Sequence, residues 1–150
     1  MAHYRIELPT DVMNEFETLL NNSEQMIGEM VQAGAEVVLH NVREKMPPQL
    51  KKYATSYTLH TTRVYRTATD GGINCGVWFG GYMKDATKDV SKSGDKGTAI
   101  ELVANMFEYG SKHREYPKHP FLRKSFHKRE IERAMLKAQK KYITDGGDLK

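Results

Sequence analysis

Residues 27–48 read IGEMVQAGAEVVLHNVREKMPP. Apolar residues recur here at steps of three and four, the spacing that places them on one face of an α-helix. The two prolines at the end cannot continue a helix. The stretch therefore predicts a long helix that faces the core and ends before Pro47, with a partner-binding groove as the alternative use of the same stripe. Small side chains at its centre permit another element to approach closely, namely Ala33, Gly34 and Ala35.

A shorter helix is expected upstream. Thr10 or Asp11 is placed to cap its first turn. Asn21-Asn22-Ser23 is expected to interrupt it before the longer helix begins. Its apolar face comprises Val12, Phe16, Leu19 and Leu20.

Downstream of the prolines the pattern changes to a period of two, the period of a β-strand. One such run covers residues 53–65 and a second covers residues 73–79. Asp70-Gly71-Gly72 favours a turn, so the two runs predict an antiparallel hairpin whose turn lies between Thr67 and Gly72. Cys75 is expected to be a small buried side chain, and as the only cysteine it cannot form an intrachain disulfide.

The segment 80–97 has a different character, because Lys and Asp are mixed with Ser and Gly and few residues are apolar. It cannot bury much surface, so we expect a long mobile loop that serves either in assembly or as an idle insertion. Its lysines recur every four residues, at Lys84, Lys88, Lys92 and Lys96.

Two further elements complete the chain. Residues 99–109 show helical spacing and are expected to form a short helix or a strand that ends at Gly110. Pro120 is placed as the first residue of a final helix, and residues 144–150 are expected to fray. These patterns predict one domain over residues 1–150, of α+β class. In it the long N-terminal helix and the C-terminal helix pack on a small antiparallel sheet built around the hairpin.

Charge is distributed unevenly along the chain. Residues 1–46 hold three basic and eight acidic side chains, a net charge of −5, whereas residues 111–141 hold eleven basic and three acidic, a net charge of +8. Two oppositely charged segments favour pairing within or between subunits, and the alternative is a basic surface that contacts nucleic acid. The basic face of the last helix comprises Lys128, Arg129, Arg133 and Lys137.

Motifs for catalysis or cofactor binding are missing from the sequence. It has no glycine-rich phosphate loop, no Gly-Xaa-Ser-Xaa-Gly and no His-Glu-Xaa-Xaa-His. His113, His119 and His127 lie among lysines and arginines with no acidic partner at a fixed spacing, so we expect no metal site, no catalytic site and no cofactor. No leader or membrane span is evident, which predicts a protein made in the cytoplasm.

Two short elements resemble the signature of the phage tail-component family, also called tail-completion or neck proteins. The first is Phe107-Glu108-Tyr109-Gly110-Ser111, and the second is Pro120-Phe121-Leu122-Arg123-Lys124-Ser125-Phe126. The family shows a Glu-aromatic-Gly-Ser/Thr element and later a Pro-Phe-Leu-Arg element, after an Ala-Gly-Ala helix, prolines and a hairpin in the same order as here. The resemblance covers most of residues 31–135. This chain departs from it at residues 49–53, where the family commonly has Thr-Gly-Xaa-Leu, and at Lys124, where it usually has Pro.

The resemblance implies a non-enzymatic structural subunit that forms a ring in the virion, at the head–tail junction, after synthesis in the host cytoplasm. Its partners would be further copies of itself and the neighbouring connector, tail-terminator or tail-tube proteins, with DNA close by in the channel and no membrane. A tail-terminator ring, a basic DNA-binding module and a metal-dependent nuclease remain the alternatives.

The motif residues also have a physical interpretation. Gly110 can adopt the left-handed conformation that ends an element, and Pro120 presets a turn. Phe121 and Leu122 are expected to anchor that turn to the core. A charge-assisted contact between Glu108 and Arg123, within one subunit or across two, is expected to fix the geometry.

Overall fold

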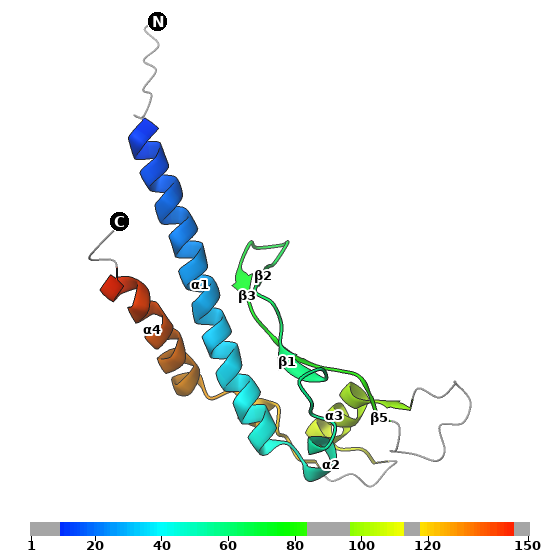
Figure 1. Ribbon diagram of the computed structural model, residues 1–150. Coiled ribbons are helices and arrows are strands. Elements are labelled where there is room, and N and C mark those ends of the chain that lie inside the picture. Colours follow the sequence, from blue (N-terminus) through cyan, green and yellow to red (C-terminus); the bar gives the residue numbers. More distant parts are fainter. Residues whose placement is uncertain (1–9, 84–96, 113–117, 146–150) are drawn as a thin grey trace, which may run out of the picture.

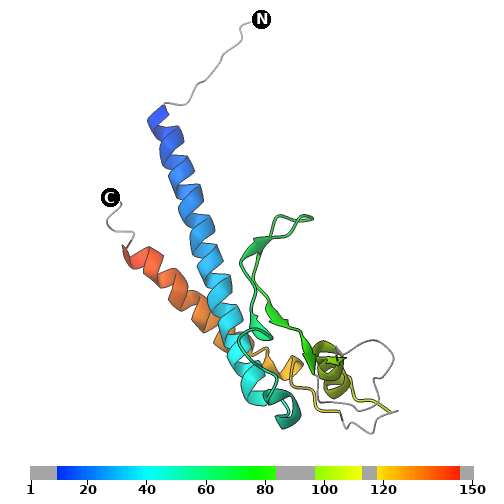
Figure 2. The same cartoon turned by 45° about the vertical axis from the view of Figure 1, so that its right-hand side comes forward.

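A single helix forms the long axis of the molecule. The computed structural model describes residues 10–83, 97–112 and 118–145, with the backbone alone for residues 10–13, 15–19 and 143–145. Helix α1 (Thr10–Lys45) carries the C-terminal helix α4 (Lys128–Asp145) along one side and a β-hairpin along the other, as Figure 1 and Figure 2 show. The predicted α+β class and long N-terminal helix are thus confirmed.

Helix α4 packs on α1 rather than on the sheet as predicted, because the hairpin covers a different side of α1. A β-carbon built at Gly34 would lie 3.1 Å from Ile131 Cγ2 and 3.3 Å from Met135 Cγ. The close approach expected at the small residues of α1 is confirmed, and α4 is the element that makes it. The Tyr142 hydroxyl donates to Glu29 at 2.6 Å. The later residue of α4 thus meets the earlier residue of α1, while Ile131 and Met135 meet Gly34, so the two helices run antiparallel.

Helix α1 continues without a break through Asn21-Asn22-Ser23, where the sequence predicted an interruption. The Ser23 hydroxyl donates to the Leu20 carbonyl at 2.7 Å, inside the same helix. The Ser23 hydroxyl is therefore satisfied inside the helix and does not end it. Each asparagine lowers helix stability by only a fraction of a kcal/mol relative to alanine, so Asn21 and Asn22 do not end it either. The prediction of two separate helices is wrong. The predicted end is confirmed, because α1 stops at Lys45 and Pro48 opens the single-turn helix α2 (Pro48–Lys51).

The predicted hairpin consists of two short antiparallel ladders. Strand β1 (Leu59–Thr61) pairs with β4 (Val77–Phe79), and β2 (Tyr65–Arg66) pairs with β3 (Ile73–Asn74). The turn is confirmed where the sequence placed it. The Thr67 N–H donates to the Gly72 carbonyl at 2.9 Å, and Gly71 adopts a φ of +68°, which a side chain would disfavour.

A β-bulge separates the two ladders. Thr61 lies opposite Val77 and Tyr65 lies opposite Asn74, so three residues of one strand face two of the other. Gly76, on the shorter side, donates its N–H to the Thr62 hydroxyl at 2.8 Å. A bulge shifts by one residue which side chains point to each face of the hairpin. The prediction that side chains alternate regularly over residues 53–65 is therefore wrong beyond Thr61.

The strand predicted from Tyr53 begins instead at Leu59. The Thr58 hydroxyl donates to the Tyr53 carbonyl, and the Leu59 N–H donates to the Thr55 carbonyl at 2.9 Å. These local bonds fold residues 53–58 into turns, which is how threonine competes with strand pairing. Cys75, expected to be buried, is half-buried, and its thiol donates to the Thr62 carbonyl at 3.3 Å.

The segment 99–109, predicted as helix or strand, is mostly a helix. Helix α3 (Ile100–Tyr109) follows β6 (Thr98–Ala99), which pairs antiparallel with β5 (Tyr82–Met83). Gly110 ends α3 with a φ of +81°, as expected. Most of the loop predicted at 80–97 and most of the predicted frayed end fall at residues 84–96 and 146–150, outside the described residues.

The last helix begins later than predicted, at Lys128 rather than at Pro120. Between them the chain forms a short 3-10 helix, η2 (Arg123–Ser125), closed by a hydrogen bond of 2.6 Å from the Ser125 hydroxyl to the Phe121 carbonyl. Phe121 is buried in the core with α3, whereas α4 packs on α1. One straight helix cannot meet both surfaces, so the chain turns between them.

The buried core lies at the C-terminal end of α1, where α2, α3 and the base of the hairpin gather (Figure 1). Leu50 and Leu59 are fully buried there, and Ile100 and Phe121 are 1% exposed. This core links the segments that carry the two motifs to the long helix. Its buried members are Val38, Val42, Met46, Leu50, Leu59, Met83, Ile100, Val103, Ala104, Phe107 and Phe121.

Candidate functional site

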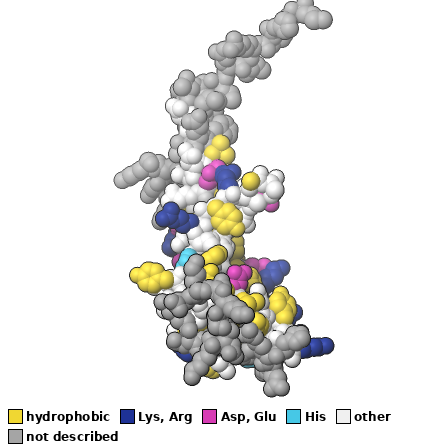
Figure 3. Space-filling model, turned by 90° about the vertical axis from the view of Figure 1, so that its right-hand side faces the viewer, with side chains coloured by type: hydrophobic (Ala, Val, Ile, Leu, Met, Phe, Trp, Pro, Cys, Tyr) yellow, Lys and Arg dark blue, Asp and Glu magenta, His cyan; other side chains and the backbone are white. Residues whose placement is uncertain are grey.

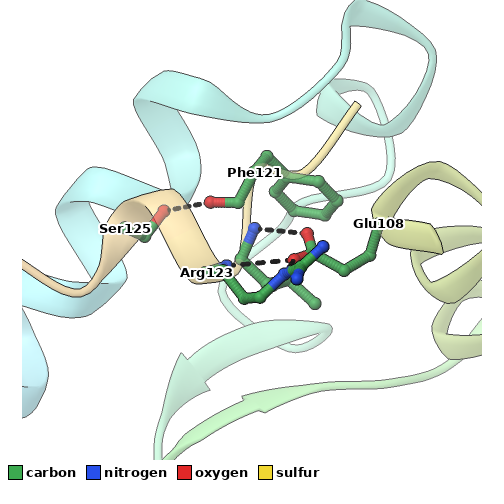
Figure 4. A network of polar contacts seen from close by, with 5 residues as sticks. Glu108, Phe121, Arg123 and Ser125 are labelled. Carbon is green, nitrogen blue, oxygen red and sulfur yellow. Dashed lines mark hydrogen bonds and ion pairs between the residues drawn. The ribbon is translucent and has the colours of Figure 1, made fainter. Parts of the chain in front are cut away.

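Glu108 lies where the end of α3 meets the segment after Pro120. Its side chain is only 2% exposed, yet its carboxylate accepts three hydrogen bonds (Figure 4). Arg123 Nε donates to Oε1 at 2.8 Å, the Arg123 N–H donates to the same oxygen at 3.2 Å, and the Leu122 N–H donates to Oε2 at 2.9 Å. The contact expected between Glu108 and Arg123 is confirmed, and it lies within one chain.

The ionised form of Glu108 is favoured by this arrangement. Burial raises the pKa of the Glu108 carboxyl, but the hydrogen bond from the Arg123 side chain, the two backbone N–H groups and the Arg123 charge outweigh it. The pKa therefore lies below its ordinary value of 4.5. The two motif elements are thus joined by charge-assisted bonds as well as by apolar packing.

The other motif residues surround this contact. The Arg123 guanidinium carbon lies 5.5 Å from the centroid of the Tyr109 ring, a distance at which a cation is attracted to the ring face. Phe121 is buried in the core and Leu122 packs against it, as expected for an anchor. Tyr109, Leu122 and Arg123 are therefore brought together around the buried Glu108 carboxylate, whereas Gly110 lies beside Lys118.

Asn41 belongs to the neighbouring polar network, although the sequence pattern did not single it out. It is 7% exposed, and its amide donates to the Ser125 carbonyl at 3.2 Å and to Glu130 Oε2 at 3.0 Å. These bonds tie α1 to η2 and α4. A polar residue between Val38 and Val42, on the core-facing stripe of a helix, is the signal that could have found it.

The predicted basic face lies on α4. Arg129, Arg133 and Lys137 are exposed at successive four-residue steps, so they share one side of the helix. Lys128 belongs to another side and pairs with Glu132 at 3.7 Å. Three of the four predicted residues therefore form one basic row.

The remaining predicted residues are not brought into a site. His119 and His127 are exposed, and His127 contacts Lys45. In the part of the chain that the structure describes, no group of three or more His, Cys, Asp or Glu side chains is arranged to hold a metal ion. Outside the described residues lie Lys84, Lys88, Lys92, Lys96 and His113.

A groove of about 550 Å³ runs between α1 and α4. Ala33 and Val37 line it from α1, and Ala134 and Ala138 line it from α4, in each case four residues apart. Small apolar side chains from both helices thus leave an open channel along the pair. Polar and charged residues line it as well, namely Glu36, His40, Asn41, Glu130, Lys137 and Lys141.

Large apolar side chains are exposed on and near the hairpin. Trp78 is 51% exposed, Tyr65 is 53% exposed, and Tyr57, just before the first strand, is 89% exposed. Figure 3, which faces this side of the molecule, shows hydrophobic side chains separated by charged ones. Separate apolar residues of this kind are common on protein surfaces and do not by themselves define a binding site.

Comparison with known proteins finds no matching family model, no matching curated protein and no matching solved structure. Among the described helices, none is long and apolar enough to cross a membrane.

Proposed function

We propose that this protein is a structural subunit of a tailed phage, a tail-completion protein that forms a ring at the head–tail junction. The observation that carries the proposal is the contact between Glu108 and Arg123. These residues belong to the two sequence elements that resemble the tail-component signature. One buried carboxylate gives a physical reason for the two elements to occur together, because each would leave unpaired polar groups without the other.

The shape and charge of the molecule support a role in assembly. Helix α1 has 36 residues and is therefore about 54 Å long at 1.5 Å per residue. A ring of identical head-to-tail contacts needs two different complementary patches on each subunit. The net charges of −5 on residues 1–46 and +8 on residues 111–141 give the chain two segments of opposite sign, and opposite charges favour pairing across an interface.

In this proposal the subunit acts by joining other proteins and carries out no reaction. Its neighbours in the virion are further copies of itself, the head connector above and the tail tube below. DNA passes through the channel that the ring surrounds.

Mass photometry of the purified chain and cryo-electron microscopy of the particle test this proposal. We expect closed rings, and density for the chain between the head connector and the tail tube. Density at the end of the tail tube itself would assign the chain to the tail-terminator position instead. A chain that is absent from the particle would refute both positions. Loss of infectious particles in Arg123→Ala, with unchanged folding and ring formation, would contradict a structural role for this pair.

A DNA-binding module is the second candidate, and the exposed row of Arg129, Arg133 and Lys137 favours it. Each phosphate that such a row neutralises makes binding more sensitive to salt. Filter binding to duplex DNA across a salt series separates the two candidates. A dedicated module should bind tightly at low salt and lose affinity steeply as salt rises, whereas absence of binding at low salt excludes it.

A further inference from the structure

Helix α1 extends well beyond the elements that pack on it. In Figure 1 and Figure 2 its N-terminal turns project past the end of α4 and past the tip of the hairpin. Near this end Glu24 pairs with Arg66 of the hairpin, and Glu29 accepts the Tyr142 hydroxyl of α4. Residues 10–23 lie beyond these contacts and form about four turns of helix, roughly 20 Å long.

The projecting turns, residues 10–23, combine apolar residues at helical spacing with acidic charge. Leu20 is 61% exposed there. The helical backbone is continuous here, and in the sequence Phe16 follows Val12 by four residues, while Leu19 and Leu20 follow Phe16 by three and four. Acidic residues of the same turns, with no basic residue among them, are Asp11, Glu15 and Glu17.

The groove between α1 and α4 has complementary properties. The small side chains of Ala33 and Ala134 leave room for larger apolar side chains of a third helix, which pack into grooves of this kind. Lys137 and Lys141 line it, and by the antiparallel register they lie toward its Ala33 end, where they outnumber the one acidic lining residue, Glu36. Glu130 lies at the other end, beside Asn41. Acidic turns that entered at this end would lie near both lysines.

We infer that the projecting turns of α1 dock in the α1–α4 groove of a second copy of this chain, an inference that rests on the proposed ring. The contact cannot form within one chain, because residues 10–20 and Ala33 belong to one continuous helix and are separated by about 20–35 Å along it. Each subunit then offers its projecting turns to one neighbour and its groove to another. Such a head-to-tail interface closes into a ring when the rotation between subunits allows it.

Two substitutions and two matched controls test the contact in the full-length chain. Leu20→Lys places a cation on the apolar face of the projecting turns, and Asn21→Lys places the same cation on another side of the helix. Ala33→Trp fills the groove, and Gln32→Trp adds the same ring at an exposed position that does not line it. Native mass spectrometry should show self-association weakened about tenfold or more by Leu20→Lys and Ala33→Trp, and unchanged by the controls.

Mixing the two disrupted variants gives the sharper result. The Leu20→Lys chain keeps an intact groove and the Ala33→Trp chain keeps intact projecting turns, so together they should form a one-to-one dimer that cannot grow. Formation of this dimer also shows that both variants are folded.

The remaining outcomes separate this inference from the proposed function. Rings formed by either disrupted variant as readily as by wild type would overturn the docking contact and leave the ring intact. A mixture that stays monomeric would also overturn the contact. Wild-type protein that stops at a dimer would overturn the head-to-tail arrangement. Wild-type protein that stays monomeric at millimolar concentration would overturn both the proposed ring and the docking contact.

Discussion

Arg123 Nε lies 2.8 Å from Oε1 of Glu108, and the two partners differ sharply in their exposure to solvent. The Glu108 side chain is 2% exposed, whereas that of Arg123 is 57% exposed. Two backbone N–H groups share the same carboxylate. Loss of the glutamate side chain would therefore leave three hydrogen-bond donors without their acceptor. Of these, the Arg123 side chain is exposed enough to bond to water instead.

Glu108→Gln is expected to lower the free energy of unfolding by about 2–3 kcal/mol, because a neutral amide replaces a charged acceptor of three hydrogen bonds. Arg123→Gln should cost less, since water and the backbone N–H groups still serve the carboxylate. Urea unfolding measures both. Glu101→Gln, at an exposed position on the same helix, is the control and should change little. Equal losses at Glu101 and Glu108 would contradict the role of the buried carboxylate.

Stability should also depend on pH through Glu108. Its pKa is lowered in the folded protein, so the unfolded chain takes up the proton at a higher pH than the folded chain does. The stabilisation is fully present above the ordinary value of 4.5 and is lost as pH falls through the lower folded pKa. Urea midpoints should decline in this acid range for wild type and decline less for Glu108→Gln. If the urea midpoints of wild type and Glu108→Gln decline equally as pH falls, other carboxyl groups cause the acid sensitivity.

The sequence predicted the features that depend on a single proline or glycine. Pro47 and Pro48 cannot continue a helix, and α1 ends just before them. Gly71 supplies the positive φ of the hairpin turn, and Gly110 supplies the one that ends α3. A charge-assisted contact between Glu108 and Arg123 could be predicted, because these oppositely charged residues belong to two elements that resemble one family signature. Whether it joins one chain or two required the structure.

Long-range packing decided the features that local rules did not predict. The Asn41 amide bonds to Ser125 and Glu130, which are 84 and 89 residues away along the chain, so no local pattern names its partners. Helix α4 starts late because Phe121 is held in the core while α4 follows α1. The groove between α1 and α4 exists only once those helices are placed side by side.

Asn41→Ala should destabilise the attachment of α4 to α1. The substitution leaves the Ser125 carbonyl and Glu130 without their amide donor, and the expected cost is about 1–3 kcal/mol. Amide hydrogen exchange should increase in α4 more than in α3. Asn105→Ala, at an exposed position on α3, is the control and should be nearly neutral. Equal exchange in both helices would indicate that Asn41 supports the whole fold rather than this junction.

Gly28 and Gly34 both lie inside α1, and the structure predicts different results for the same substitution. A β-carbon at Gly28 would lie 3.6 Å from Val64 Cγ1, an ordinary contact, so Gly28→Ala should raise the free energy of unfolding by about 0.5–1 kcal/mol through better helix propensity. At Gly34 the new carbon would lie 3.1 Å from Ile131 Cγ2, so α4 must move away, and the strain should cancel that gain or exceed it. Urea unfolding of the two variants gives the comparison directly. If Gly34→Ala proves as stable as Gly28→Ala, α4 is not held against α1 at this position.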